Sequence, residues 1–512
     1  MQQPKWDIET DVLVVGYGGA GAVTAITAHD VGAKVLIIEK QLADTATITH
    51  HTPNTRMSGG GWLCPPNTKS ALRYLCGMLK IANETIDPER KELLSIFSKH
   101  LVESTEWLRS IGLQIRNIEK DGVSSEQWEF FKEYPDLPGG ECCRIYRAKT
   151  IDNLRSGAAF FQSLSDAVKK RRIELLWGTS GQHLVLQAGK VIGMQARKNG
   201  ESIAIKAKRG IVLTCGGFEY NDWMKENYLR VNPVMFGGNP GNTGDGINIA
   251  VEVGSALWHM NCASWRVVMN FSDHPISFTT QLHETASIFV DKKGNRFTNE
   301  RLKMHAFGYE LTNYDCHAMC YPRVPCYWIF DEKRRAMAPL ASLNGACNPP
   351  GGIPGEIYYS WSSDNKAEID KGWIMKANTI EKLANLIAAD SDNNGLMRTS
   401  VMIDTVKKYN QFCHNEEDLD FHKPKEFLSF LEDPPYYAVK LWPGGLNTQG
   451  GPKRNKYGMV LRPDNAPINR LYSAGELGSI WGMLYQGGGN LGECVSSGRI
   501  AGENVANEPL LT

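Results

Sequence analysis

The segment Val12-Leu-Val-Val-Gly16-Tyr-Gly18-Gly-Ala-Gly21 is typical of a buried β-strand that passes through a glycine turn into a helix. A second apolar strand follows and ends in an acid, Lys34-Val-Leu-Ile-Ile-Glu39. In such a unit Gly16 permits the tight turn, Gly18 lets a pyrophosphate approach the backbone, and Gly21 lets the helix pack closely on the strand. The phosphate lies at the helix N-terminus, where free N–H groups and the helix dipole favour an anion. Glu39 stands 23 residues after Gly16, within reach of a ribose hydroxyl, and the pattern therefore predicts a dinucleotide-binding domain.

Length and composition favour a multidomain globular protein. The chain has 512 residues, enough for two or three domains, and its 56 basic and 56 acidic side chains give no overall field to gather nucleic acid or an anionic membrane. The longest apolar runs are strand-length, below the roughly 20 residues of a membrane span, and no signal peptide precedes the first strand. Twelve cysteines without a CxxC pair are typical of free thiols in a reducing compartment. We therefore expect a soluble, cytoplasmic protein with no membrane span and no nucleic acid partner.

The order of predicted elements divides the chain into one dinucleotide-binding domain and one inserted domain. The first part holds the βαβ unit, helices between 69 and 113, and a meander of short strands that ends near Gly217. Residues 263–430 have a different texture of aromatics, prolines and loops. Dinucleotide-binding character then returns with a strand at 470–474 and a helix at 491–506. The predicted division is 1–262 and 431–512 for the two parts of the first domain, with 263–430 inserted between them.

Four glycine-bearing loops, at 16–21, 58–61, 216–217 and 487–489, are more than one nucleotide phosphate requires. An FAD lying lengthwise in the domain would use them all, with its adenosine at Glu39 and its flavin ring against the later loops. A second GxGxxG after a strand, expected of a flavoprotein that takes electrons from NAD(P)H, is missing, so we expect one bound dinucleotide. The predicted cofactor-binding residues are Gly16, Gly18, Gly19, Ala20, Gly21, Glu39, Lys40, Ser58, Gly59, Gly60, Gly61, Gly216, Gly217, Asp245, Gly475, Glu476, Asn490 and Leu491.

Further motifs extend over nearly the whole chain. They are Ser58-Gly-Gly, Thr214-Cys-Gly-Gly, Asn242-Thr-Gly-Asp-Gly, Arg296-Phe-Thr-Asn-Glu300, Ala474-Gly-Glu and Gly498-Arg-Ile-Ala-Gly502. With the first glycine segment, they resemble the fumarate reductase/succinate dehydrogenase flavoprotein superfamily, which also contains 3-ketosteroid dehydrogenases. The resemblance implies an α/β fold in which a Rossmann-like FAD-binding domain carries an inserted α+β capping domain.

Two positions separate this chain from the dicarboxylate-using branch of that superfamily. The soluble fumarate reductases have one arginine as proton donor and another that grips a substrate carboxylate. At the family's spacing, the first position falls on Met304 and the second on Tyr485. A guanidinium stays charged and binds carboxylate with two hydrogen bonds, whereas Met and Tyr do neither. The sequence therefore disfavours fumarate and succinate as substrates.

The segment Tyr485-Gln-Gly-Gly-Gly489 is similar to the Tyr-Pro-Gly-Gly-Gly segment of the 3-ketosteroid dehydrogenases. The resemblance implies that the Tyr485 hydroxyl and the Gly489 N–H grip a substrate ketone and stabilise the enolate that forms. Gln486 in place of proline is a departure from the family pattern. The alternative, in which Tyr485 merely packs beside Trp481, Met483 and Leu484, remains open.

The general base is predicted from its family position just after Asn299-Glu300. His305 and Tyr309 are the candidates there, with His305 nearer the family position; Tyr314 and Tyr321 are weaker ones. An ordinary packing role is an equal alternative for each. On position alone, Arg266 or Arg301 is a candidate to hold one substrate carboxylate.

The mode of cofactor attachment and the surroundings of the flavin are also predicted. His50-His51-Thr52 resembles the His-Thr pair through which the succinate dehydrogenase branch binds flavin covalently, but the family spacing places Pro53 at that position. Non-covalent FAD is therefore expected. Trp62, Trp481, Met483 and Leu484 are consistent with an apolar slot over the flavin or, equally, with core packing. Cys316, His317 and Cys320 lack metal-site spacing, so no metal is predicted.

The predicted function is that of an FAD-dependent oxidoreductase acting on a carbon–carbon bond beside a carbonyl. The favoured reaction is α,β-dehydrogenation of a cyclic ketone, either a 3-ketosteroid or an oxocyclohexane derivative, by proton abstraction and hydride transfer to flavin N5. The alternatives are an enone or enoate reductase that runs in the opposite direction with a separate electron donor, and a non-catalytic flavin-binding protein. The electron acceptor or donor is an unidentified partner, because the chain has no haem-binding CxxCH.

Overall fold

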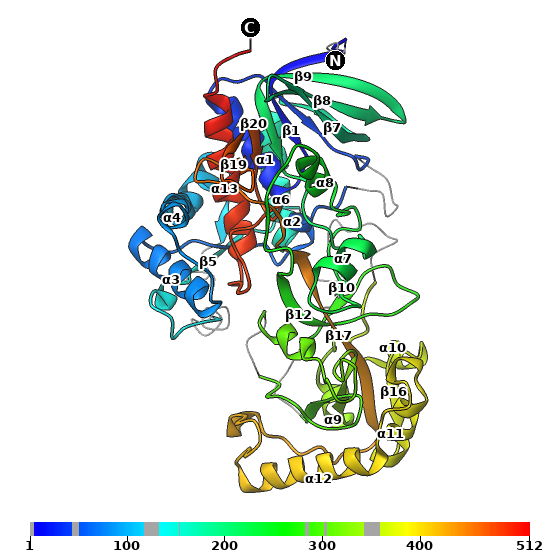
Figure 1. Ribbon diagram of the computed structural model, residues 1–512. Helices are drawn as coiled ribbons and strands as arrows, with labels where there is room; N and C mark the ends of the chain where they lie inside the picture. The colour runs from blue at the N-terminus through cyan, green and yellow to red at the C-terminus, as the bar shows by residue number, and fades with distance from the viewer. Residues whose placement is uncertain are drawn as a thin grey trace.

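Two large β-sheets organise the chain, and Figure 1 shows them in the upper and lower parts of the molecule. The computed structural model describes residues 5–43, 51–116, 133–152, 154–281, 286–301, 305–341 and 359–511. Over these ranges, no helix combines the length and the apolar character that a membrane span requires.

The upper sheet has the parallel core of a dinucleotide-binding fold. Its strand order is β19-β20-β9-β1-β2-β6, with parallel pairing from β20 to β6. The apolar run Val12–Val15 in β1 pairs with β2 on one side and β9 on the other, and all but complete burial suits such a central strand. These strands are β1 (Ile8–Val15), β2 (Val35–Ile38), β6 (Glu174–Leu176), β9 (Glu201–Leu213), β19 (Met459–Leu461) and β20 (Pro467–Ser473).

An antiparallel extension joins this sheet through β9. β7 (Thr179–Gln187) pairs with β8 (Lys190–Lys198), and β8 pairs with β9. The antiparallel part of the predicted meander thus consists of β7, β8 and β9, while β6 pairs in parallel with β2, and the last strand, β9, continues from Glu201 to Leu213. One strand therefore belongs to both the antiparallel extension and the parallel core.

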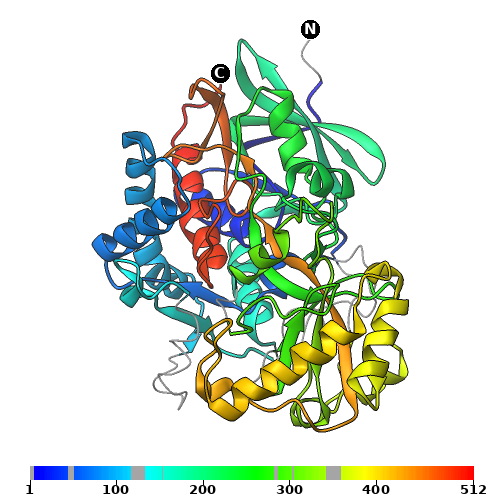
Figure 2. The same cartoon turned by 60° about the horizontal axis from the view of Figure 1, so that its bottom comes forward.

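Helices from the two ends of the chain pack together beside the parallel sheet. α1 (Gly19–Asp30) is buried from Gly19 to Ala28 and lies against α13 (Gly489–Ala506), as Figures 1 and 2 show in blue and red. The other helices among the described residues of this region are α2 (Asn54–Met57), α3 (Thr68–Ile81), α4 (Pro88–Ser110), α6 (Ser156–Lys170), α7 (Asp222–Tyr228) and α8 (Asp245–Glu252). A small sheet, β3 (Gly61–Leu63), β5 (Ile145–Ala148) and β4 (Ile115–Arg116), lies beside them, with the turn η1 (Gly140–Cys142). β11 (Leu257–Trp258) and β18 (Gly451–Pro452) form a separate pair.

The lower sheet forms the core of the inserted domain. Its order is β13-β12-β17-β15-β14, with β10 and β16 also paired to β17. α11 and α12 cover one face, where Leu383 and Met402 pack with Ile288 and Ile329, and Figure 2 shows α12 along the outside of the domain. The elements are β10 (Met235–Phe236), β12 (Ala263–Met269), β13 (Phe278–Thr279), β14 (Ser287–Val290), η2 (Phe307–Thr312), β15 (Cys326–Phe330), α9 (Glu332–Met337), α10 (Lys366–Asp370), β16 (Met375–Ala377), α11 (Ile380–Ala389), η3 (Ser391–Asn393), α12 (Thr399–Asn415), η4 (Lys425–Phe427) and β17 (Tyr436–Thr448).

The capping sheet extends past the boundary expected at 430/431. β17 follows that boundary, yet it is the central strand of the sheet and pairs with β12 and β15. β10, before residue 263, also pairs with β17. Strand pairing therefore crosses both expected boundaries, and pairing over such a sequence distance leaves no local signal in the pattern.

Candidate active site

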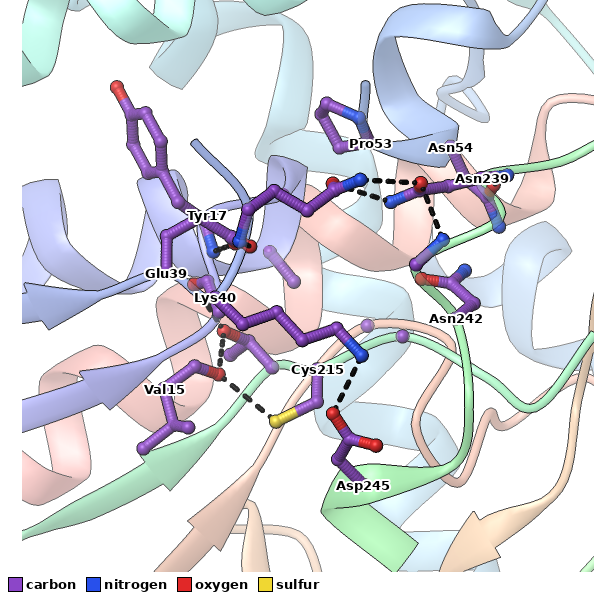
Figure 3. A pocket seen from close by; sticks show the side chains of 18 of the residues that line it. Val15, Tyr17, Glu39, Lys40, Pro53, Asn54, Cys215, Asn239, Asn242 and Asp245 are labelled. Carbon is purple, nitrogen blue, oxygen red and sulfur yellow. Dashed lines mark hydrogen bonds and ion pairs between the residues drawn. The ribbon is translucent and has the colours of Figure 1, made fainter. Parts of the chain in front are cut away.

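A cavity of about 810 Å³, its open mouth included, lies at the carboxyl ends of the parallel strands β1, β2, β9 and β20 (Figure 3). Ligands of open α/β sheets bind at this edge. The predicted cofactor-binding residues that line the cavity are Gly16, Gly18, Gly19, Ala20, Glu39, Lys40, Gly216, Asp245, Gly475 and Glu476. One cavity thus gathers predicted residues from five separate segments of the chain.

The first glycine turn has the close geometry that a phosphate cradle needs. Gly16 has φ +102°, and a Cβ there would lie 2.7 Å from the Thr214 carbonyl oxygen. A Cβ on Gly21 would lie 2.1 Å from the Gly16 carbonyl oxygen. α1 begins at Gly19 without an acidic residue in its first turn. Its N-terminal end therefore favours an anion in the cavity.

Glu39 is fixed at the end of β2, where it lines the cavity. Its carboxylate accepts the backbone N–H groups of Tyr17 and Gln41, each at 2.8 Å. Each carboxylate oxygen keeps a further lone pair, and a ribose hydroxyl can donate to it. The ring nitrogen Nε2 of His51, also in the cavity wall, lies 2.8 Å from the Tyr17 carbonyl oxygen.

Polar side chains that the sequence pattern missed complete this part of the wall. The side-chain amides of Gln41 and Asn239 pair with each other at 3.0 and 3.1 Å. Figure 3 shows Lys40 reaching Asp245, with Nζ 2.7 Å from the carboxylate. Lys40 and Asp245 were predicted separately; the structure joins them in an ion pair. No sequence spacing pointed to the amide pair.

Two carboxyl groups, Glu219 and Glu476, share one amide donor at the inner end of the cavity. The Asn54 side-chain amide donates to Glu219 Oε1 at 3.0 Å and to Glu476 Oε1 at 2.9 Å. Burial raises the pKa of Glu219 to about 7, and burial with the charge of Glu219 raises the pKa of Glu476 well above its usual value. At neutral pH the pair therefore holds a proton, because two such close carboxylates resist full ionisation.

Replacing Glu219 by glutamine is expected to stabilise the protein above about pH 8 and to change little near pH 5. The pKa of Glu219 rises from 4.5 to about 7 on folding, so the folded state binds more protons and the free energy of unfolding falls as pH rises through that window. Glutamine mimics the protonated form and removes a cost of up to about 3 kcal/mol. Thermal melting at both pH values measures this, with the exposed Glu92→Gln as control. An equal shift at both pH values contradicts it.

The remaining predicted cofactor residues lie behind or beyond the cavity wall. Ser58 caps its own loop, since its hydroxyl donates to the Thr55 carbonyl at 2.8 Å and accepts from the Gly60 N–H at 3.1 Å. Asn490 donates from its side chain to Asn447 at 2.7 Å. The predicted residues outside the wall are Gly21, Ser58, Gly59, Gly60, Gly61, Gly217, Asn490 and Leu491. The glycine turn, the bare helix N-terminus and Glu39 together fit the pyrophosphate and ribose of a dinucleotide such as FAD.

The structure brings two of the predicted catalytic residues into ring contact. Tyr485, 7% exposed, and His305 have ring centroids 4.7 Å apart at 88°. The Asn490 N–H donates to the Tyr485 hydroxyl oxygen at 3.3 Å, and among the described residues the hydroxyl proton has no acceptor, so it is free to be donated. Burial raises the pKa of the Tyr485 phenol, so it stays protonated. This phenol is set up as a hydrogen-bond donor beside an imidazole.

The backbone N–H of Gly489, which we expected to donate to the substrate ketone, already has an acceptor within the protein. That N–H donates to the Gln486 carbonyl at 2.8 Å within the turn 486–489. Glycine is required at this position for lack of space, because a Cβ on Gly489 would lie 2.6 Å from the Trp481 indole. In this arrangement Tyr485, and not the Gly489 amide, is the available donor.

Tyr309 is committed to a structural contact. Its hydroxyl donates to the Met483 carbonyl at 2.6 Å, and burial raises the pKa of its phenol. Both effects oppose a tyrosinate base. The loop that carries Tyr485 is thereby tied to η2.

The other predicted residues divide between the site and the core. Arg266 lies close enough to Tyr485 for its charge to oppose the rise in the phenol pKa. Arg301 stacks on Phe427 with its guanidinium carbon 4.1 Å from the ring centre. Trp62 is fully buried and donates to Thr105 at 3.1 Å, so it belongs to the core. Tyr314 is half exposed and contacts Tyr321, while Met304 and His50 lie outside the described residues.

Glu133 is the functional candidate that the sequence pattern missed. It is 4% exposed, and its carboxylate contacts the ring Nδ1 of His305. The two residues are 172 positions apart, so no local spacing could have revealed the pair.

Comparison with known proteins supports the picture built from the geometry. The family model described as the FAD binding domain matches residues 11–491. A 3-oxosteroid 1-dehydrogenase of Mycobacterium tuberculosis is 26% identical, with 98% of this chain and 99% of that protein covered. The fumarate reductase (cytochrome) of Shewanella frigidimarina is 24% identical over 97% of this chain and 77% of that protein. The predicted superfamily is confirmed.

Solved structures show the same fold. The 3-ketosteroid delta1-dehydrogenase from Sterolibacterium denitrificans, in complex with 1,4-androstadiene-3,17-dione, has a TM-score of 0.76 at 23% identity, covering 97% of this chain and 99% of that one. The open conformation of a flavocytochrome c3 fumarate reductase has a TM-score of 0.66 at 23% identity, covering 98% and 78%. These likenesses confirm the predicted fold class.

Proposed function

The chain belongs to the FAD-binding domain family, and on this premise we propose that it is an FAD-dependent dehydrogenase acting on cyclic ketones. The reaction removes two hydrogens from the carbon–carbon bond beside the carbonyl. The observation that carries the proposal is the contact between the Tyr485 phenol, whose proton is free to be donated, and the His305 imidazole.

The proposed chemistry divides between these two side chains. The Tyr485 hydroxyl donates to the ketone oxygen and stabilises the negative charge that develops as the α-proton leaves. His305 accepts that proton. When bound, FAD supplies the acceptor for the hydride that leaves the β-carbon. Proton and hydride together account for the two hydrogens lost, and the product is the α,β-unsaturated ketone.

The substrate class follows from which donor is present. Tyr485 stands where, by the family spacing, diacid-using relatives carry an arginine, and a neutral phenol suits a ketone oxygen better than a carboxylate. The relatives named above include a 3-oxosteroid 1-dehydrogenase. We therefore propose a 3-ketosteroid or an oxocyclohexane derivative as substrate.

Anaerobic titration of the FAD-loaded enzyme tests the proposed function. A panel of 3-ketosteroids and oxocyclohexane derivatives is expected to include a compound that bleaches the flavin absorbance in proportion to the amount added. The proposed direction fails when no ketone bleaches the flavin.

The opposite direction is the second candidate, favoured by the relatedness to a fumarate reductase. An enone or enoate reductase would use the same phenol and imidazole with an external electron donor. Its signature is reoxidation of the dithionite-reduced flavin by enones under anaerobic conditions. A flavin that responds to neither class of compound supports the third possibility, a non-catalytic flavin-binding protein.

We also propose that the FAD is held without a covalent bond, and that acid precipitation therefore releases all the flavin into the supernatant. Pro53 has no nucleophilic side chain, and the Nε2 of His51 is engaged by the Tyr17 carbonyl. His51 also lies 3.9 Å from Glu39, at the proposed adenosine end of the cofactor. The measurement is flavin absorbance in the supernatant after trichloroacetic acid treatment. Fluorescent protein on a denaturing gel contradicts this proposal, and His50→Ala then shows whether the neighbouring histidine is the site of attachment.

A further inference from the structure

The carboxylate of Glu133 holds His305 by two points. One oxygen accepts the His305 backbone N–H at 3.1 Å, and the other contacts the ring Nδ1. The side chains of Glu133 and His305 are 3% and 10% exposed, so water competes little for either contact. Both the backbone and the ring orientation of His305 are therefore fixed by one buried group.

This contact selects which nitrogen of the imidazole is basic. In a neutral ring one nitrogen carries the proton and the other a lone pair, and an acceptor on one side fixes the choice. A carboxylate on Nδ1 keeps the proton there. The lone pair is then on Nε2, at the opposite end of the ring.

Gln486 holds Glu133 in turn. Its side-chain oxygen accepts the Glu133 backbone N–H at 3.3 Å and the Tyr74 hydroxyl at 2.5 Å, and Gln486 is fully buried. This is the position where the resembling ketosteroid dehydrogenases have proline, which has no side-chain oxygen to accept these bonds. Gln486 also follows Tyr485 directly in the chain.

These contacts close a ring of four residues. Gln486 binds Glu133, Glu133 binds His305, and the His305 ring contacts the ring of Tyr485, the neighbour of Gln486. The base and the ketone donor are thus held at a fixed separation by side chains from three distant segments. The rate acceleration that a general base provides depends on how precisely it is positioned against the proton that it removes.

We propose that Glu133 and Gln486 are positioning residues that hold His305 as the base, with Nε2 toward the substrate. The inference rests on the proposed function, since it assigns the base of that reaction. It makes His305 rather than Tyr309 the proton acceptor. In this proposal Glu133 and Gln486 act on the reaction by holding His305, not by contact with the reacting atoms.

The test is the rate of flavin reduction at saturating ketone, measured by anaerobic stopped flow on the FAD-loaded enzyme. Glu133→Gln is expected to slow reduction about 10- to 100-fold, the size found when a hydrogen-bond partner that orients a metal-binding histidine is removed, with little change in the ketone concentration for half-saturation. Glu133→Asp is expected to recover part of the rate. Gln486→Met, which keeps the length but removes the acceptor, is expected to give a smaller loss.

The double variant His305→Gln/Glu133→Gln separates positioning from a merely structural role. If Glu133 acts through His305, the double variant is no slower than His305→Gln alone. A further 10-fold loss in the double variant, or an unchanged rate in Glu133→Gln, overturns the inference. Glu92→Gln, an exposed carboxylate removed elsewhere, controls for nonspecific effects, and bound FAD confirms folding of each variant.

Failure of the proposed function has a different signature. In that case the wild-type flavin responds to no ketone, and the inference falls with the function it rests on. If only enones react, the same set of variants is measured in flavin reoxidation, where His305 returns the proton and the same pattern of losses is expected.

Discussion

His305→Gln is expected to keep FAD bound and to slow ketone-dependent flavin reduction by about two to four orders of magnitude, the contribution of a general base. Glutamine preserves the size and the hydrogen-bonding capacity toward Glu133 but has no basic lone pair. The described neighbours offer no ready substitute, because the Tyr309 hydroxyl is given to the Met483 carbonyl and burial raises the pKa of its phenol. Stopped-flow reduction measures the loss.

Two further variants test whether the loss is specific to His305. Tyr309→Phe removes the rival base and is expected to keep most of the rate, with some loss from the freed Met483 carbonyl. His29→Gln removes a histidine in the last turn of α1, whose ring lies 3.1 Å from the Asp30 carboxylate, and is expected to behave as wild type. A large loss in Tyr309→Phe with a small one in His305→Gln reverses the assignment of the base.

Much of the FAD-binding part could be predicted from the sequence because its signals are local. The first two strands of the parallel core contain short apolar runs, Val12–Val15 and Val35–Ile38, and Glu39 directly follows β2 where the pattern places it. Gly21 is required by its close contact with the Gly16 carbonyl within the same βαβ unit, whereas the contact that requires Gly16 is with Thr214, at the end of β9. A residue whose function depends on neighbours within one unit leaves a spacing that can be recognised.

The capping sheet and the base-holding contacts could not be predicted, because they join distant segments. β17 pairs with β12 and β15, more than one hundred residues earlier in the chain. Gln486 and Glu133 are 353 positions apart. The sequence shows Gln486 only as a departure from the family pattern. Its hydrogen bond to Glu133 can be recognised only in the folded structure.

The Gly489 result shows a further limit of motif transfer. The glycine occupies the family position, but its N–H closes the turn with the Gln486 carbonyl. A motif fixes residue types, whereas hydrogen bonding within a turn depends on its backbone conformation. Gln486 differs from the proline of the resembling enzymes, and a proline at this position cannot make the side-chain contacts that Gln486 makes here.

Tyr485→Phe is expected to keep FAD and to lower ketone turnover by about two to three orders of magnitude, the size typical of deleting one oxyanion donor. The variant removes only the hydroxyl, so the ring contacts with His305 and Trp481 remain. Since the Gly489 N–H donates to the Gln486 carbonyl, it is not ready to replace the phenol. We expect the turnover rate to fall more than the affinity for the ketone, because the phenol binds the developing enolate more strongly than the ketone of the ground state.

Measuring ketone binding and the rate of flavin reduction separately tests this explanation. The dissociation constant of the ketone from the oxidised enzyme is measured from the shift of the flavin spectrum. We expect it to change by less than 10-fold in Tyr485→Phe, while the rate of flavin reduction falls much more. Tyr314→Phe removes a phenol from a half-exposed position and serves as the matched control. Unchanged turnover in Tyr485→Phe removes the phenol from the mechanism, because a donor to the enolate cannot be lost without slowing the step in which that charge forms.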